Sequence, residues 1–126
     1  MTREILGGKI HSAHVTQVNL EYEGSCAIDE DLLDLANIRP WERVHVYNMN
    51  SGVRFDTYAI PGKRGSGVIG LNGAAARLGQ KGDRVIIVSF VQIEEEALDA
   101  HKPAVVVVDE KNRPIKHMHH TMHRKP

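Results

Sequence analysis

The sequence has little cysteine, few aromatic residues, no long apolar run and no net charge. The single cysteine, Cys26, excludes an internal disulfide framework and a cysteine-based zinc cluster. No apolar run approaches the roughly 20 residues that a membrane-spanning helix needs. Lysine and arginine number 16, as do aspartate and glutamate, so the chain lacks the basic surplus typical of nucleic-acid binding. We therefore expect no membrane and no nucleic-acid partner.

The remaining composition is that of one ordinary globular domain. The 126 residues are 41% hydrophobic and 25% charged. The N-terminus, MTREILGGK, lacks the apolar region of a signal peptide. Together with the lone cysteine, this predicts a cytoplasmic protein. We expect one domain over residues 1–110 and a polar, histidine-rich, frayed tail over residues 111–126.

Short runs of β-branched residues predict strands. The run VIIVSFVQI indicates a strand buried on both faces. Asp29 is a predicted N-cap for a short helix that ends near Asn37, and Gly79 closes a second one. The predicted strands cover residues 4–18 (with a break at Gly7 and Gly8), 25–28, 43–48, 53–60, 68–71, 85–93 and 104–108, and the predicted helical segments cover 30–37, 74–78 and 94–100. This pattern favours a mainly β fold, closed or nearly closed into a barrel, because closure removes exposed strand edges.

Four motifs offer candidate functional residues, and each also has a purely structural interpretation. The segment 22–26, YEGSC, fits a surface turn, and it lacks the G-x-S-x-G elbow of a conventional serine hydrolase. In the segment 54–60, RFDTYAI, alternate side chains share a face of a half-buried strand. The segment 72–76, NGAAA, exposes backbone N–H groups suited to a carboxylate, or it is a tight turn. Lys9 and His11 share one face of the first strand.

The late histidines raise the question of a metal site. They could hold a divalent ion loosely, but a tail does not preorganise ligands. We therefore expect no functional metal site. Five of the eight histidines belong to this group: His101, His117, His119, His120 and His123.

Taken together and in order, these motifs resemble the pyruvoyl-dependent aspartate 1-decarboxylases over roughly residues 1 to 100. The matching segments are YEGSCAID (22–29), RFDTYAI (54–60), NGAAA (72–76) and GDRVIIVSF (82–90), with Lys9, His11 and Val15-Thr16 upstream. The resemblance implies a small six-stranded double-psi β-barrel with short helices, assembled as a homotetramer. The histidine-rich tail lies outside it.

The resemblance also implies decarboxylation of L-aspartate to β-alanine and CO2, for pantothenate and coenzyme A synthesis. The proenzyme would be cut between Gly24 and Ser25 into chains 1–24 and 25–126. Attack by the Ser25 hydroxyl on the Gly24 carbonyl, followed by elimination and hydrolysis, would leave a pyruvoyl group at position 25. Thr57 would donate to the Gly24 carbonyl oxygen, and Gly24, lacking a Cβ, could adopt a strained geometry. An imine between pyruvoyl and the substrate amine would be the electron sink, with no metal and no pyridoxal phosphate.

The resemblance assigns the remaining site residues. Arg54 and Lys9 would hold a substrate carboxylate, and Tyr58 would return a proton to Cα. A regular strand puts Thr57 and Tyr58 on opposite faces, so we expect a twist, a bulge or a subunit boundary there. The substrate-binding set is Lys9, Arg54, Thr57, Asn72, Gly73, Ala74 and Ala75.

Two other functions remain open at this point. A non-enzymatic β-barrel binding module would keep the Gly24-Ser25 peptide intact. An N-terminal nucleophile hydrolase would be cleaved there but would retain Ser25 as serine. The sequence also leaves open whether cleavage needs an accessory maturation factor.

Overall fold

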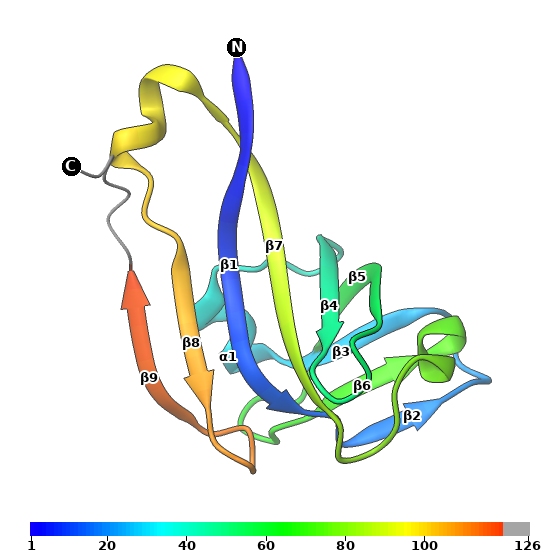
Figure 1. The fold of residues 1–126 in the computed structure, drawn as a ribbon. Helices are drawn as coiled ribbons and strands as arrows, with labels where there is room; N and C mark the ends of the chain where they lie inside the picture. The colour runs from blue at the N-terminus through cyan, green and yellow to red at the C-terminus, as the bar shows by residue number, and fades with distance from the viewer. Residues whose placement is uncertain (120–126) are drawn as a thin grey trace.

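The computed structural model describes residues 1–119, and this part of the chain is mainly β (Figure 1). Most predicted strands and helices are confirmed to within a few residues. The nine strands are β1 (Thr2–His14), β2 (Gln17–Asn19), β3 (Ser25–Asp29), β4 (Arg43–Asn48), β5 (Arg54–Gly62), β6 (Ile69–Asn72), β7 (Arg84–Glu94), β8 (Ala104–Val108) and β9 (Pro114–His119). The helices are α1 (Glu30–Ala36) and the 3₁₀ helices η1 (Gly73–Arg77) and η2 (Glu95–Ala100).

The strands form one sheet in the order β2-β6-β3-β5-β4-β7-β1-β8-β9. Three neighbouring pairs are parallel (β1 with β8, β2 with β6, β3 with β5), and the others are antiparallel. Within the described residues, β2 and β9 at the two ends of this order do not pair. The mainly β class is therefore confirmed, and strand pairing gives nine strands in an open order.

The core consists of aliphatic side chains from the strands, packed with those of α1. Asp29 accepts a hydrogen bond from the Asp31 N–H at 2.9 Å, which confirms the predicted cap. The end of α1 packs directly on β1, since a Cβ at Gly8 would stand only 1.8 Å from the Ala36 carbonyl oxygen. The largest fully buried side chains are Ile10, Val15, Ile28, Leu32, Leu33, Val44, Val46, Ile69, Leu71, Val85, Ile87 and Val106.

The expectation of a frayed tail was wrong for residues 111–119. Strand β9 pairs with β8 in antiparallel register, from Ala104 opposite His119 to Val108 opposite Pro114. Asn112, in the turn before β9, is 1% exposed and hydrogen-bonded to the rest of the molecule. The hydropathy of this segment does not indicate the strand, because its side chains are mostly exposed and only its backbone groups pair with β8.

Two other expectations concern metal and membrane. Residues 120–126, including His120 and His123, lie outside the described residues. Residues 1–119 contain no group of three or more histidine, cysteine, aspartate or glutamate side chains placed to hold a metal ion. Every helix in the same range is too short or too polar to span a bilayer.

Candidate active site

Ser25 and Asn72 form a buried polar pair where β3 begins and β6 ends. Each is 3% exposed, and their backbones pair in the antiparallel register of these strands. The Asn72 Nδ2 group donates a hydrogen bond of 3.0 Å to Ser25 Oγ. Asn72 Oδ1 is buried without a hydrogen-bond partner among the described residues. A buried acceptor of this kind is costly, so its presence beside a hydroxyl indicates a place where a ligand or reacting group is accommodated.

Gly24 and Gly73 bring the backbone of the predicted cleavage site against η1. Gly73 has φ +65°, and a Cβ there would lie 2.7 Å from Gly24 Cα and 2.8 Å from Gly24 N. Gly24 itself is exposed, has no left-handed φ, and would have nothing within 4 Å of an added Cβ. The expectation of a strained Gly24 is therefore not supported. The steric need for glycine lies at position 73.

Thr57 and Gly24 line one small cavity of about 150 Å³. Within residues 1–119 no hydrogen bond joins these two residues. The cavity is closed by the start of η1, so four of the residues predicted for processing and substrate binding meet here. Its full lining is Gly24, Phe55, Asp56, Thr57, Ala74, Ala75 and Leu78.

The pairing of β3 with β5 aligns the backbones of Thr57 and Tyr58 with the predicted cleavage site. These strands are parallel, with Cys26 opposite Ala59. Following both strands back one residue at a time brings Ser25 level with Tyr58 and Gly24 level with Thr57. The register of β5 with β3 and with β4 has no shift, so the bulge expected between Thr57 and Tyr58 is absent.

Tyr58 and Arg54 lie on the other face of β5 from Thr57. The ring of Tyr58 stacks on Trp41, with centroids 5.4 Å apart and planes inclined by 18°. The guanidinium of Arg54 lies 4.2 Å from the centroid of the Tyr47 ring. Arg54 begins β5 and Tyr58 lies in its middle, and these contacts hold the two side chains apart on an open face of the sheet.

Lys9 belongs to the same face, on a distant strand. It pairs with Val88 of β7, which pairs with His45 of β4, which in turn pairs with Asp56 of β5. Paired residues point to the same side of a sheet, and three strand spacings put Lys9 about 14 Å from β5. Within one chain, Lys9 therefore lies apart from the cluster around Ser25.

The structure thus divides the predicted site into two groups. One group surrounds the Gly24-Ser25 peptide: Gly24, Ser25, Thr57, Asn72, Gly73, Ala74 and Ala75. The other, Lys9, Arg54 and Tyr58, is spread over the open face of the sheet. Sequence reasoning missed Trp41, although a lone tryptophan directly after Pro40 in a chain with few aromatic residues was a signal that could have found it.

Two ionisable side chains beside these groups, His11 and Cys26, have shifted pKa values. Burial, together with the charges of Lys9 and Arg84, lowers the pKa of His11 from its usual value. Complete burial raises the pKa of the Cys26 thiol to about 12. Cys26 directly follows Ser25, yet it is a protonated, inert core residue rather than a nucleophile.

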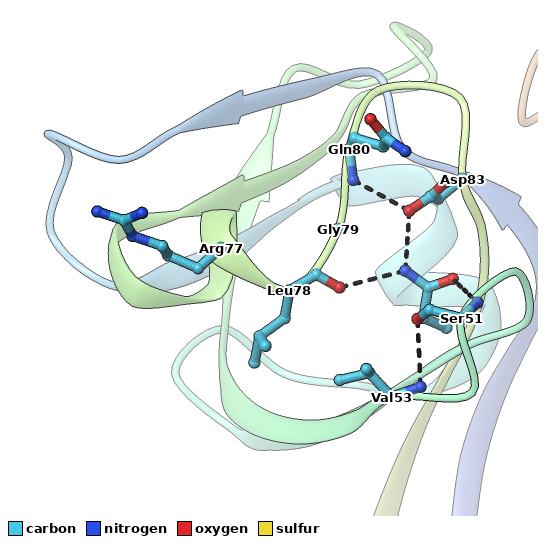
Figure 2. Close-up of a pocket in the computed structure, with 8 residues that line it drawn as sticks. Ser51, Val53, Arg77, Leu78, Gly79, Gln80 and Asp83 are labelled. Carbon is cyan, nitrogen blue, oxygen red and sulfur yellow. Dashed lines mark hydrogen bonds between the residues drawn. The ribbon is translucent and has the colours of Figure 1, made fainter.

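A larger hollow of about 310 Å³ beside η1 has a structural explanation (Figure 2). The Asn48 side-chain amide makes all four hydrogen bonds that it can make. Its Nδ2 group donates to the Leu78 carbonyl and to the Asp83 carboxylate, and its Oδ1 accepts from the N–H groups of Asn50 and Ser51. Asp83 also accepts from the Gln80 N–H. These polar groups satisfy one another and join two turns, and none of the predicted site residues lines the hollow.

Comparison with known proteins agrees with the motifs. The family model described as aspartate decarboxylase matches residues 1–115. The aspartate 1-decarboxylase of Neisseria meningitidis is 59% identical over 113 residues, covering 90% of this chain and 89% of that protein. That of Leptospira biflexa is 58% identical over 110 residues, covering 86% and 93%. That of Anoxybacillus flavithermus is 53% identical over 113 residues, covering 90% and 89%. The chain belongs to the aspartate decarboxylase family.

Proposed function

We propose that this protein is a carboxy-lyase that converts L-aspartate to β-alanine and CO2, supplying pantothenate and coenzyme A synthesis. The relatives named above are aspartate 1-decarboxylases, and they match this chain over most of its length. The observation that carries the proposal is the buried Ser25–Asn72 pair, with Gly73 against the peptide to be cut.

The first step of the proposal is self-cleavage. Ser25 Oγ attacks the carbonyl carbon of Gly24, the Gly24–Ser25 C–N bond breaks, and an ester forms in its place. Elimination releases residues 1–24 with a free carboxylate, and hydrolysis of the remaining dehydroalanine releases ammonia. Asn72 supports this step because its amide already orients the Ser25 hydroxyl. Thr57 supports it because it lines the same cavity as Gly24, where a hydroxyl can stabilise the developing oxyanion.

The resulting pyruvoyl group would supply an electron sink for the carbanion left by loss of CO2. The residues around position 25 fit such a group, since the Asn72 Nδ2 group can donate to a carbonyl oxygen there, and the buried, unpartnered Asn72 Oδ1 can accept from the amine of the substrate. The first N–H groups of η1, from Gly73 to Ala75, lack intrahelical partners and suit a carboxylate. Arg54 and Lys9 would bind a carboxylate of the substrate, and Tyr58 would supply a proton to its Cα.

The proposal includes a homotetramer in which neighbouring chains complete each site. Its support is the separation of Lys9 from Ser25 within one chain, which a second copy can bridge. Apolar side chains just before the cleavage point are also exposed: Leu20 is 45% and Tyr22 59% exposed. We further propose the double-psi barrel and a cytoplasmic location for this assembly. Whether cleavage needs an accessory maturation factor is tested by the same experiment that tests cleavage itself.

Mass spectrometry of the purified full-length protein tests this function. We expect two chains, residues 1–24 and 25–126, with the larger one lacking the mass of ammonia relative to a chain that begins with serine. Ser25→Ala should fold and remain a single chain. One intact wild-type chain without activity would favour the binding module, and cleavage with an unmodified Ser25 would favour the hydrolase. Cleavage only after addition of cell extract would indicate an accessory factor.

A further inference from the structure

We infer that Trp41 is a positioning residue that holds the Tyr58 ring in place for the decarboxylation step. This inference rests on the proposed function, in which Tyr58 supplies the proton. Trp41 lies outside every motif that pointed to the family. It is the only tryptophan in the chain, and its indole stacks on the Tyr58 ring at 5.4 Å between centroids.

Trp41 does not have the environment of a core tryptophan. Its side chain is 71% exposed. It also borders a wide, open hollow of about 550 Å³, lined by Asn37, Arg39, Pro40, Trp41, Glu42 and Val91. A large apolar ring left in this position gains little from burial in the chain itself. Its one aromatic contact among the described residues is Tyr58, so that contact is the feature to explain.

The backbone fixes Trp41 at this place in an unfavourable conformation. Its φ is +74°, a region that bulky side chains rarely occupy. Two hydrogen bonds to β5 hold it there: the Trp41 N–H donates to the Ala59 carbonyl at 2.7 Å, and the Ala59 N–H donates to the Glu42 carbonyl at 2.9 Å. Both bonds reach the residue directly after Tyr58. Strained residues persist where the surrounding structure over-determines them, and they concentrate at functional sites.

The turn that carries Trp41 is closed by its own contacts. The Arg39 N–H donates to the Glu42 carboxylate at 2.9 Å, and the Glu42 N–H donates to the Arg39 carbonyl at 3.1 Å. Segment 39–42 is thus a closed loop attached to β5 beside Tyr58. The indole stacks on the Tyr58 ring from this loop and so limits the orientations that the ring can take. A proton donor confined in this way spends more time in its productive orientation.

The test combines variants of both residues and follows aspartate turnover. Trp41→Ala should lower kcat about 3- to 10-fold, as expected for loss of an aromatic stack, with KM changed less than about twofold. Trp41→Phe keeps a ring on Tyr58 and should restore most of kcat. In a Tyr58→Phe background, Trp41→Ala should cause no further loss, because the hydroxyl that it positions is already absent.

Tryptophan fluorescence gives a second readout that does not depend on turnover. Because Trp41 is the only tryptophan, its emission reports on this stack alone. Tyr58→Leu removes the ring and should change the emission, whereas Tyr58→Phe should leave it nearly unchanged. Unchanged emission in Tyr58→Leu would overturn the stack itself.

Two kinetic results would also overturn the inference: an unchanged kcat in Trp41→Ala, or an equal loss in the Tyr58→Phe background. A change of oligomeric state in Trp41→Ala, measured by light scattering, would overturn it as well. If Tyr58→Phe alone retains normal turnover, the proposed role of Tyr58 fails instead. The fluorescence result then still decides whether Trp41 holds the Tyr58 ring.

Discussion

Gly73 and Gly24 lie in backbone contact: a Cβ at position 73 would stand 2.7 Å from Gly24 Cα, inside the distance that real side chains keep. The start of η1 therefore fixes where the peptide between Gly24 and Ser25 runs. This contact joins segments nearly 50 residues apart in the chain, and it ties the turn proposed to bind a carboxylate to the proposed cleavage point.

Gly73→Ala should impair cleavage while the domain still folds. The added methyl must displace the Gly24 backbone, and φ +65° disfavours alanine by about 1 kcal/mol. We expect the melting temperature to fall by several degrees and cleavage, followed by gel electrophoresis, to slow at least about tenfold. Gly24→Ala is the control for stability, since its Cβ meets nothing within 4 Å, and it should melt within a few degrees of wild type. Wild-type cleavage in Gly73→Ala would show that the Gly24 backbone can move freely.

Tyr58→Phe should separate maturation from turnover. The ring and its stack on Trp41 are retained, and Ser25 and Thr57 are untouched. Mass spectrometry should show normal cleavage and the normal modification at position 25, while β-alanine production falls about 10²- to 10⁴-fold. Near-normal turnover would assign the proton to another group or to water. Failure to cleave would move Tyr58 into processing.

Asn112→Ala should destabilise the domain by about 2–4 kcal/mol, although position 112 lies in a segment that reads as a tail. Its side chain exchanges two hydrogen bonds with the His14 backbone, at 2.7 and 2.8 Å, and donates a third to the Gly67 carbonyl at 2.7 Å. Each such bond contributes about 1 kcal/mol, and unsatisfied partners add to the loss. Urea denaturation measures the effect. Ile115→Ala, at a side chain that is 65% exposed, should stay within about 0.5 kcal/mol, and equal effects of the two changes would contradict this assignment.

His11 should make the fold less stable as the pH falls. Its pKa is lowered in the folded protein, first by burial and then by Lys9 and Arg84, so the unfolded chain binds the proton more readily. The stability that neutral His11 contributes is complete above the usual value of 6.5 and is lost as the pH falls from there toward the folded pKa. Melting temperatures between pH 7.5 and 5 should therefore decline less steeply in His11→Gln. Arg84→Met removes one of the two charges and should reduce the decline partly; identical slopes in all three proteins would contradict this prediction.

The sequence by itself determined most of the strand and helix pattern and the family motifs. Val44 and Val46 alternate with polar residues, so the strand at 43–48 could be placed to the residue, and the acid-rich start at Asp29 located α1. These features depend on neighbours within a few residues, whose periodicity and capping are local properties. The order of the motifs around Ser25, Arg54 and Asn72 was likewise readable without coordinates.

Only the tertiary structure decided which of these residues meet. The parallel register of β3 with β5 aligns Gly24 and Ser25 with Thr57 and Tyr58, a long-range pairing that no local pattern specifies. The need for glycine at 73 rather than 24, and the stack of Trp41 on Tyr58, likewise arise from backbones and rings brought together across the fold. Strand β9 was missed for the same reason: its side chains are mostly exposed and show no buried apolar face. Backbone hydrogen bonds to β8, which leave no trace in the hydropathy of the sequence, hold it in the sheet.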